Sequence, residues 1–220
     1  MGKVLITNWQ RKLLEITSKD QFITKTFFLT GGTVLSYFYL QHRFSEDLDF
    51  FSETEYSSEQ LLVSIKTISK ILKPKKIEQQ KLNNQDVFYF HFDSQNKVKI
   101  DFAYFPFPHF GKFGKINNLK VSSMEDIAVN KLQAIISRKR ARDYIDLKLS
   151  IERLGWNLSD LRKNYRLKYD FYLGPDQLAT SFTNVTEASD LPLFLGDTDF
   201  EEVEKFFLLW ASQLKKEVLK

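Results

Sequence analysis

The stretch from Phe27 to Phe51, FFLTGGTVLSYFYLQHRFSEDLDFF, constrains the fold more than any other part of the chain. It opens on a short apolar run, Phe27 to Leu29, that is typical of a buried strand. Two glycines and a threonine follow where a helix is expected to begin. Apolar residues then recur at helical spacing as far as Phe38, and after Arg43 the period changes to two. The stretch therefore predicts a strand, a glycine turn, a helix and a second strand.

The second strand carries two acidic residues. Asp47 and Asp49 alternate with Leu48 and Phe50, so a strand places both carboxylates on one face and both apolar side chains on the other. Adjacent carboxylates repel each other unless water solvates them or a cation bridges them. The pair is thus either a metal site or two solvated acids at a strand edge. Metal-dependent sugar transferases also use Asp-x-Asp, so the pair does not select a reaction.

Gly31, Gly32 and Thr33 form the turn before the helix. Backbone N–H groups at a helix N-terminus bind phosphate, glycine permits close approach, and the threonine adds a hydroxyl. Most glycine pairs before helices are merely tight turns, and neither a Walker sequence nor G-x-G-x-x-G is present. The turn lies one helix away from the carboxylate pair, and this combination favours a nucleotidyl-transfer enzyme.

A third acid, Asp101, lies in a later run, Lys97 to Phe105, that also alternates. The pattern groups Val98, Ile100 and Phe102 on one face and Lys97, Lys99 and Asp101 on the other. If this strand pairs beside the first, three carboxylates converge on one sheet face, which suits two Mg²⁺ ions. An ordinary surface aspartate opposite two lysines is an equally good interpretation. Runs at 76–82 and 87–92 complete an expected antiparallel meander.

From Ser122 the chain reads as helical to its end, with Ser122 and Glu125 predicting a capping box. A lead-in helix is expected before Lys25, and either Asp199 or Thr198 is expected to cap the last helix. The predicted fold class is α+β. A mixed-sheet core domain flanked by helices, residues 1–121, precedes a C-terminal helical domain, residues 122–220.

Lys131 falls on the apolar side of the first helix of the second domain. A lysine there either extends its ammonium to the surface or faces an enclosed anion. On the next helix Asp143 and Asp146 lie beside the core stripe, and Arg142 is spaced to pair with Asp146. The basic residues from Arg138 to Arg142 form either a solvated patch or a contact for RNA phosphates.

The chain contains no cysteine, which excludes disulfides and thiolate metal sites. We expect a cytoplasmic protein without a membrane-spanning segment. A net charge of +4 permits a polyanionic partner without requiring one.

Four segments in order carry a family resemblance: GGTVLSYFYLQHRFSEDLDFF, KIDF, EDIAVNKLQAIISR and RDYIDL. Together they resemble the motifs of the AbiEii/AbiGii-type nucleotidyltransferase toxins, within the DNA polymerase β-like nucleotidyltransferase superfamily. The resemblance spans roughly residues 27–154 and implies a nucleotidyltransferase sheet domain followed by a helical domain.

The resemblance also implies roles. Gly32 and Thr33, with Gly31, match the turn that holds the NTP phosphates, although many relatives have serine in place of Thr33. The candidate metal ligands are Asp47, Asp49 and Asp101, the last of which also helps to deprotonate the attacking hydroxyl. Lys131 matches a lysine that contacts the triphosphate. Asp143 matches the acid of the last motif, and Asp101, Lys131 and Asp143 are the candidate catalytic residues.

The favoured hypothesis is an Mg²⁺-dependent enzyme, with Mn²⁺ as an alternative ion, that moves a nucleoside monophosphate from an NTP to a hydroxyl. Family analogy implies a tRNA 3′ end as acceptor and a cognate antitoxin as partner. A second hypothesis keeps the site but sends the nucleotide to a protein side chain or a small molecule. A third is a non-catalytic nucleotide- or RNA-binding module.

Overall fold

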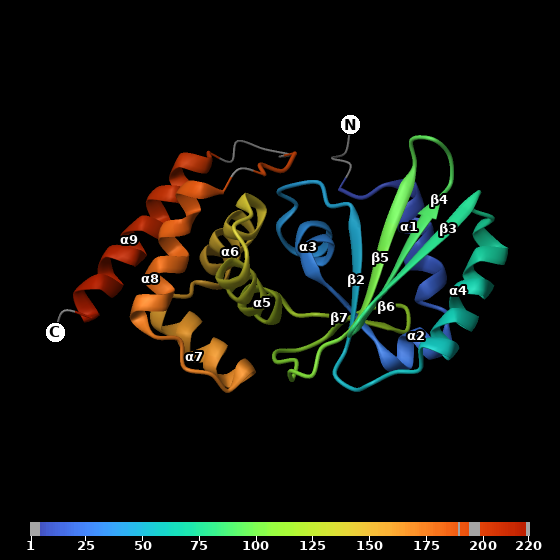
Figure 1. Cartoon of the computed structure of the whole chain (residues 1–220), viewed down its shortest axis with the longest axis horizontal. Helices are drawn as coiled ribbons and strands as arrows, with labels where there is room; N and C mark the ends of the chain where they lie inside the picture. Colours follow the sequence, from blue (N-terminus) through green and yellow to red (C-terminus); the bar gives the residue numbers. More distant parts are fainter. Residues whose placement is uncertain (1–4, 189, 194–198, 219–220) are drawn as a thin grey trace. The chain divides into compact units, whose positions relative to one another are not determined.

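A computed structural model describes residues 5–188, 190–193 and 199–218 of the chain (Figure 1). The chain divides into two compact units, Met1–Ser123 and Met124–Lys220. The first contains the strands together with helices, and the described part of the second is helical. The α+β class predicted from the sequence is therefore confirmed.

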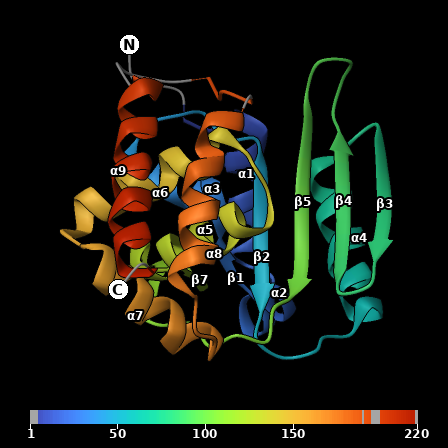
Figure 2. The same cartoon turned by 60° about the vertical axis from the view of Figure 1, so that its left-hand side comes forward.

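The first unit is built on a mixed sheet whose strands run in the order β3-β4-β5-β2-β1-β7-β6. Its strands are β1 (Phe28–Thr30), β2 (Asp47–Ser52), β3 (Lys76–Leu82), β4 (Gln85–His91), β5 (Lys97–Tyr104), β6 (Gly114–Ile116) and β7 (Leu119–Val121). Figure 2 shows β2, β5, β4 and β3 side by side in that order. The expected antiparallel meander of β3, β4 and β5 is confirmed.

The pairing of β2 with β5 matters most for the site. The two strands run parallel, and Asp49 is the direct partner of Asp101, while Asp47 is the partner of Lys99. On the other side β2 pairs antiparallel with β1, where Thr30 is opposite Asp49. The strand that carries Asp101 therefore does lie beside the one that carries Asp47 and Asp49.

Helices lie on both faces of this sheet (Figure 1). They are α1 (Asn8–Thr17), α2 (Gln21–Thr26), α3 (Gly31–Val34), the π-helix η1 (Leu35–Leu40) and α4 (Ser58–Leu72). Helices α1, α2 and α4 cover the face onto which Leu48, Phe50 and Phe102 project, and α3 lies on the opposite face. The apolar half of each alternating strand is thereby buried, and the acidic half faces α3.

Two local predictions for the first unit were wrong. The expected single lead-in helix is divided, because α1 ends at Thr17 and Asp20 caps a separate helix α2 by accepting from the N–H of Ile23 at 2.9 Å. The first four residues of that prediction lie outside the described part of the chain. Strands β6 and β7 were not predicted, since three residues each leave too little alternation to detect.

The second unit packs its helices around aromatic residues, including Tyr144, Phe182, Phe207 and Trp210. The helices are α5 (Met124–Ser137), α6 (Ala141–Leu154), α7 (Leu158–Tyr169), α8 (Pro175–Thr183), the 3₁₀ helix η2 (Asn184–Glu187) and α9 (Phe200–Val218). Gly155 ends α6 in the left-handed region, at φ 67°, as the sequence predicts.

The helix starts follow the predictions less closely. The predicted cap of α5 by Ser122 is wrong, because α5 begins at Met124 and the buried Ser122 hydroxyl has no hydrogen-bond partner among the described residues. At α9, Asp199 accepts from the N–H of Glu201 at 2.9 Å, and Thr198 lies outside the described residues. No helix in the described ranges combines the length and the apolar character needed to cross a membrane.

Candidate active site

The first unit gathers three carboxylates on one face of its sheet. Asp49 and Asp101 are partners across β2 and β5, and Asp47 lies two residues earlier on the same face of β2. Neighbouring strands are about 4.8 Å apart, so Asp49 and Asp101 are direct neighbours across the two strands. The side chain of Asp47 is 34% exposed and that of Asp101 only 4%, so the group lies at a boundary between solvent and core.

Lys99 lies among these acids. Its Nζ is 2.5 Å from Asp101 Oδ2 and 3.7 Å from Asp47 Oδ2, and Gln85 Nε2 donates to Asp101 Oδ1 at 3.0 Å. Burial raises the pKa of Asp101, and Asp47 adds to that rise, against the opposing effects of Lys99 and Gln85. Burial lowers the pKa of Lys99, but the neighbouring carboxylates outweigh it and the pKa is raised overall. The ammonium therefore stays charged and neutralises part of the group.

The glycine turn lies directly against this group. Gly31 has φ +79°, and a Cβ there would collide with the carboxylate of Asp49. A Cβ on Gly32 would collide with the guanidinium of Arg43, which is 3% exposed and donates through Nη1 to the Phe44 carbonyl at 3.0 Å. Glycine is thus required at Gly31, where the backbone is left-handed and the Asp49 side chain passes close by, whereas at Gly32 the nearest atoms are the end of the flexible Arg43 side chain.

Thr33 has a different environment from the one expected for a phosphate donor. Its side chain is fully buried, and its hydroxyl donates to the main-chain oxygen of Asp47 and bonds the Ser45 hydroxyl at 2.9 Å. These contacts fix the start of α3 against the start of β2. The hydroxyl thus holds the turn beside the acids, and the backbone N–H groups are left to contact phosphate.

These residues suit a hard divalent cation in their chemistry, because carboxylate oxygens are the ligands that Mg²⁺ prefers. The buried Thr30 hydroxyl, opposite Asp49, has no hydrogen-bond partner among the described residues and offers one more oxygen. Across the described ranges, however, no three acidic or histidine side chains stand in a ready-made metal-binding arrangement. The pairing of Lys99 with two of the acids is one physical reason for this.

The second unit contains a separate cluster of charges between α5 and α6. Lys131 Nζ lies 2.7 Å from Asp143 Oδ1 and 2.7 Å from Asp146 Oδ2, and Arg138 Nε lies 2.7 Å from Asp143 Oδ2. Asp146 thus pairs with Lys131, a partner that the helical spacing did not suggest. The lysine neither reaches the surface nor lies in an apolar environment, because two carboxylates hold it within the unit.

The two carboxylates of this second cluster and Lys131 are shielded from solvent, while the Arg138 side chain is 47% exposed. The side chains of Asp143 and Asp146 are 0% exposed and that of Lys131 is 9% exposed. Burial by itself raises the pKa of Asp143, but Lys131 and Arg138 outweigh it and hold the pKa below its usual range. A second buried pair, Lys168 to Asp126 at 2.5 Å, joins α7 to α5. Ion pairs therefore hold the helices of the second unit together at two buried points.

Sequence reasoning placed the acids, the turn and the face that Lys99 shares with Asp101, but it gave Lys99 no role and did not single out Gln85 or Arg43. The signal for Lys99 was present, since a lysine two residues before Asp101 on a strand shares its face. No local signal points to Arg43, which reaches Gly32 because the chain reverses at Gln41, a left-handed residue at φ 52°. The contact of Gln85 with Asp101 depends on the register of β4 with β5, which the sequence does not reveal.

A mixed sheet with adjacent strand acids beside a glycine turn, followed by a helical unit, defines a nucleotidyltransferase. The sequence profile of the family "Nucleotidyl transferase AbiEii toxin, Type IV TA system" matches residues 12–209. The chain therefore belongs to the AbiEii nucleotidyltransferase toxin family, and it is a nucleotidyltransferase of the toxin type. An NTP substrate and an antitoxin partner follow from membership of this family.

Several known proteins are similar to the chain. An uncharacterised protein of Aquifex aeolicus (strain VF5) is 30% identical over 190 residues, which cover 84% of this chain and 86% of that protein. JHP933 of Helicobacter pylori is similar in structure with a TM-score of 0.59 at 23% identity, covering 96% of this chain and 91% of that one. MenT4, a nucleotidyltransferase toxin of Mycobacterium tuberculosis H37Rv, has a TM-score of 0.51 at 12% identity, covering 93% and 82%. At these identities the two solved structures support the fold.

Proposed function

We propose that the protein transfers a nucleoside monophosphate from an NTP to a hydroxyl at a tRNA 3′ end, in an Mg²⁺-dependent reaction that releases pyrophosphate. The observation that carries this proposal is the register of β2 with β5, which sets Asp49 directly beside Asp101 with Asp47 on the same face. The glycine turn that lies against Asp49 supplies the neighbouring phosphate site.

In this proposal the backbone N–H groups of Gly31, Gly32 and Thr33 bind the triphosphate, and the hydroxyl of Thr33 keeps that turn in place. The acceptor hydroxyl attacks the α-phosphorus, the bond to the β-phosphate breaks, and pyrophosphate leaves. Asp101 takes the proton of the attacking hydroxyl, a role that suits a carboxyl group whose pKa burial raises.

Asp47, Asp49 and Asp101 would hold the Mg²⁺ ions, with Mn²⁺ as an alternative. When bound, such ions orient the triphosphate and stabilise the charge that develops during the displacement. The chain's own contribution is to fix three carboxylates on rigid strands, where neighbouring residues limit their rotation. Lys99 then has to release Asp101 and Asp47, because the same carboxylate oxygens cannot bind the ammonium of Lys99 and Mg²⁺ together.

Lys131 and Asp143 remain our candidates in the second unit, Lys131 for contact with the triphosphate and Asp143 as the acid of the last motif. Their ion pair supports a division of labour in which Asp143 orients the ammonium of Lys131. We also propose that a cognate antitoxin binds the protein and that both act in the cytoplasm, where NTPs and tRNA are abundant.

Two other functions use the same residues differently. Transfer to a protein side chain or a small molecule would need the same acids and turn but another acceptor. A non-catalytic nucleotide- or RNA-binding module would bind NTP without releasing pyrophosphate. Labelled NTPs incubated with either total tRNA or total protein separate the first two, and pyrophosphate release excludes the third.

The direct test is pyrophosphate release by the full chain with each NTP in the presence of tRNA, compared with the variant Asp49→Ala. We expect activity to fall by about 1,000-fold, because metal-assisted charge stabilisation contributes several kcal/mol to the transition state. The thermal midpoint should stay near that of the wild type. Retained activity in a folded Asp49→Ala protein would refute the assigned role of this carboxylate.

A further inference from the structure

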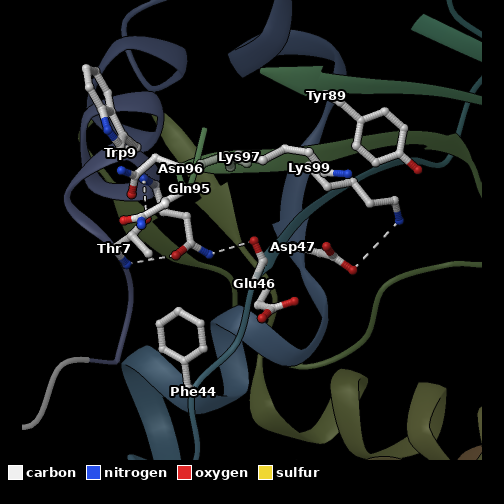
Figure 3. Close-up of a pocket in the computed structure, with 12 residues that line it drawn as sticks. Thr7, Trp9, Phe44, Glu46, Asp47, Tyr89, Gln95, Asn96, Lys97 and Lys99 are labelled. Carbon is white, nitrogen blue, oxygen red and sulfur yellow. Dashed lines mark hydrogen bonds and ion pairs between the residues drawn. The ribbon is translucent and has the colours of Figure 1, made fainter. Parts of the chain in front are cut away.

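The first unit contains a pocket with a volume of about 500 Å³ (Figure 3). Its walls come from the beginning of α1, the segment that precedes β2, and the β4–β5 hairpin. A volume of this order lies within the range of sites that bind small molecules. Asp47 and Lys99 line the pocket and also belong to the carboxylate group, so the pocket opens directly onto the proposed catalytic residues.

The sheet order places this pocket on one side of the acids and the glycine turn on the other. β2 lies between β1, which leads into Gly31, and β5, which with β4 supplies Tyr89, Lys97 and Lys99 to the pocket. A displacement at phosphorus proceeds with the attacking and leaving oxygens roughly in line. If the turn holds the triphosphate, pyrophosphate leaves on the β1 side, and the attacking hydroxyl has to arrive from the β5 side.

The lining matches a nucleotide better than an extended protein segment. Figure 3 shows Trp9, Phe44 and Tyr89 at three sides of the pocket, with the amide side chains of Gln95 and Asn96 near Trp9. Unpaired RNA bases are recognised by stacking on aromatic rings and by hydrogen bonds to their edges.

The aromatic residues have different parts in this lining. Trp9 stacks on Phe92 at 3.8 Å between ring centroids and acts as a fixed wall. Tyr89 is half-buried, and the Nζ of Lys97 lies 4.5 Å from its ring centroid. A base stacked at Tyr89 therefore has an ammonium nearby that can contact its phosphate.

The charges of the lining are balanced. Two acids and two lysines face the pocket, namely Glu46, Asp47, Lys97 and Lys99. General attraction to polyanions is therefore weak here, and recognition depends on the base and on the terminal hydroxyl.

We propose that this pocket binds the 3′-terminal nucleotide of a single-stranded RNA acceptor and presents its hydroxyl to the acids on β2 and β5. This inference rests on the function proposed above and goes beyond it by locating the acceptor. Tyr89 supplies the stacking surface, Lys97 the phosphate contact, and the Gln95 amide the contact to the base edge, while Asn96 Nδ2 bonds Asp93 at 2.7 Å and fixes the turn that carries Gln95.

The test uses a labelled single-stranded oligoribonucleotide that ends in CCA and carries hydrogen in place of its 3′-hydroxyl, so that it binds without reacting. It is titrated onto the full chain and onto Tyr89→Ala, with Tyr104→Ala as the matched control. Tyr104 is a half-buried tyrosine of the same sheet that lines a different pocket. We expect Tyr89→Ala to bind the RNA about tenfold more weakly, since each stacked base contributes on this scale. Tyr104→Ala and Tyr89→Phe should bind as the wild type does.

Three outcomes would overturn the proposal. The first is equal RNA affinity in folded Tyr89→Ala and Lys97→Gln proteins. The second is weaker binding of a non-hydrolysable NTP analogue with unchanged RNA binding, which would assign the pocket to the base of the NTP. The third is labelling of protein but not of RNA by the active enzyme. Failure here is distinguishable from failure of the proposed function, because Asp49→Ala would still abolish pyrophosphate release in the first two cases.

Discussion

Each unit of the molecule sets one lysine against two aspartates, but the two settings differ in how far water can reach them. In the first unit the side chain of Lys99 is 29% exposed and that of Asp47 is 34% exposed. Asp47 and Asp101 share this one ammonium, at 3.7 Å and 2.5 Å. The group is anchored on strands and open at one side, so a cation from solvent can reach its oxygens.

In the second unit the corresponding group is covered. Lys131 lies 2.7 Å from both Asp143 and Asp146, whose side chains are 0% exposed, and Arg138 supplies a second cation to Asp143. Two cations here match two carboxylates. Removing one partner from such a pair leaves an uncompensated buried charge, which is far more costly than the same change at the surface.

The contrast teaches that ion pairs of similar length have different uses. The open group of the first unit can exchange its lysine for another cation with little structural cost. The closed group of the second unit fixes the packing of α5 against α6 and holds one ammonium in one orientation. Exposure and charge balance, more than distance, decide which of the two groups can take up a cation from solvent.

The largest effect should come from substituting the lysine of the closed group. Lys131→Met removes the ammonium that lies 2.7 Å from both Asp143 and Asp146, whose side chains are 0% exposed, so we expect the free energy of unfolding to fall by about 3–5 kcal/mol. Lys99→Met removes the nearest cation from Asp101, which is 4% exposed but keeps its Gln85 hydrogen bond, so we expect a smaller loss of about 1–2 kcal/mol. Urea denaturation of both variants measures the difference, and equal losses would remove the basis of the comparison.

A smaller effect is expected on cation binding in the first unit. Lys99→Met removes the ammonium that competes for Asp101 and Asp47, so Mn²⁺ should bind about tenfold more tightly, equivalent to about 1.4 kcal/mol. Lys97→Met is the matched control, because Lys97 lies on the same face of β5 and contacts the Tyr89 ring. Isothermal titration with Mn²⁺ measures both. Weaker binding to Lys99→Met would mean that this lysine supports the cation site and does not compete for it.

The smallest effect concerns pH. The pKa of Asp101 is raised in the folded protein, mainly by burial. Ionisation of Asp101 therefore lowers the free energy of unfolding, and this reduction is complete once the pH has risen above the folded pKa. Asp101→Asn should therefore raise the free energy of unfolding at pH 7 by up to about 1 kcal/mol. The gain should vanish near the pKa of an unfolded aspartate.

The pKa of Asp143 is shifted in the opposite direction, so this residue serves as the comparison. Its pKa is lowered in the folded protein, because Lys131 and Arg138 outweigh burial, so its contribution is present at neutral pH and disappears as the pH falls through the folded pKa. Unfolding curves for Asp101→Asn and Asp143→Asn at several pH values test both signs. The same pH dependence in both variants would contradict the assigned environments.

Local sequence patterns predicted much of the fold and of the candidate site. The alternation around Asp47 and Asp49 requires one face for both acids in any strand, and Gly155 at a helix end requires a left-handed cap. The burial of a side chain was harder to predict than the face on which it lies, because periodicity shows which residues share a face of a strand or helix but not what covers that face. The partners of Lys131 depend on how α5 packs against α6, which no local spacing encodes.

The features that the sequence did not predict depend on the register of distant strands and on competing local signals. The register of β2 with β5 places Asp101 beside Asp49, and not one or two residues away. These strands are far apart in the sequence, so no local pattern encodes their register. The Ser122 capping signal failed because that residue still follows β7, with its N–H bonded to the Leu29 carbonyl at 2.9 Å. The hydrogen bond that continues the pairing of β7 with β1 outweighed the preference of the helix for that cap.

The central claim is that the carboxylates of β2 and β5 bind the catalytic cation. The most direct measurement is an Mn²⁺ titration of the full chain, followed by electron paramagnetic resonance, in the presence of a non-hydrolysable NTP analogue. We predict saturable binding by the wild type and by the surface control Asp176→Asn, and affinity at least about tenfold weaker in Asp49→Asn and Asp101→Asn. Unchanged Mn²⁺ affinity in folded Asp49→Asn and Asp101→Asn proteins would contradict the claim.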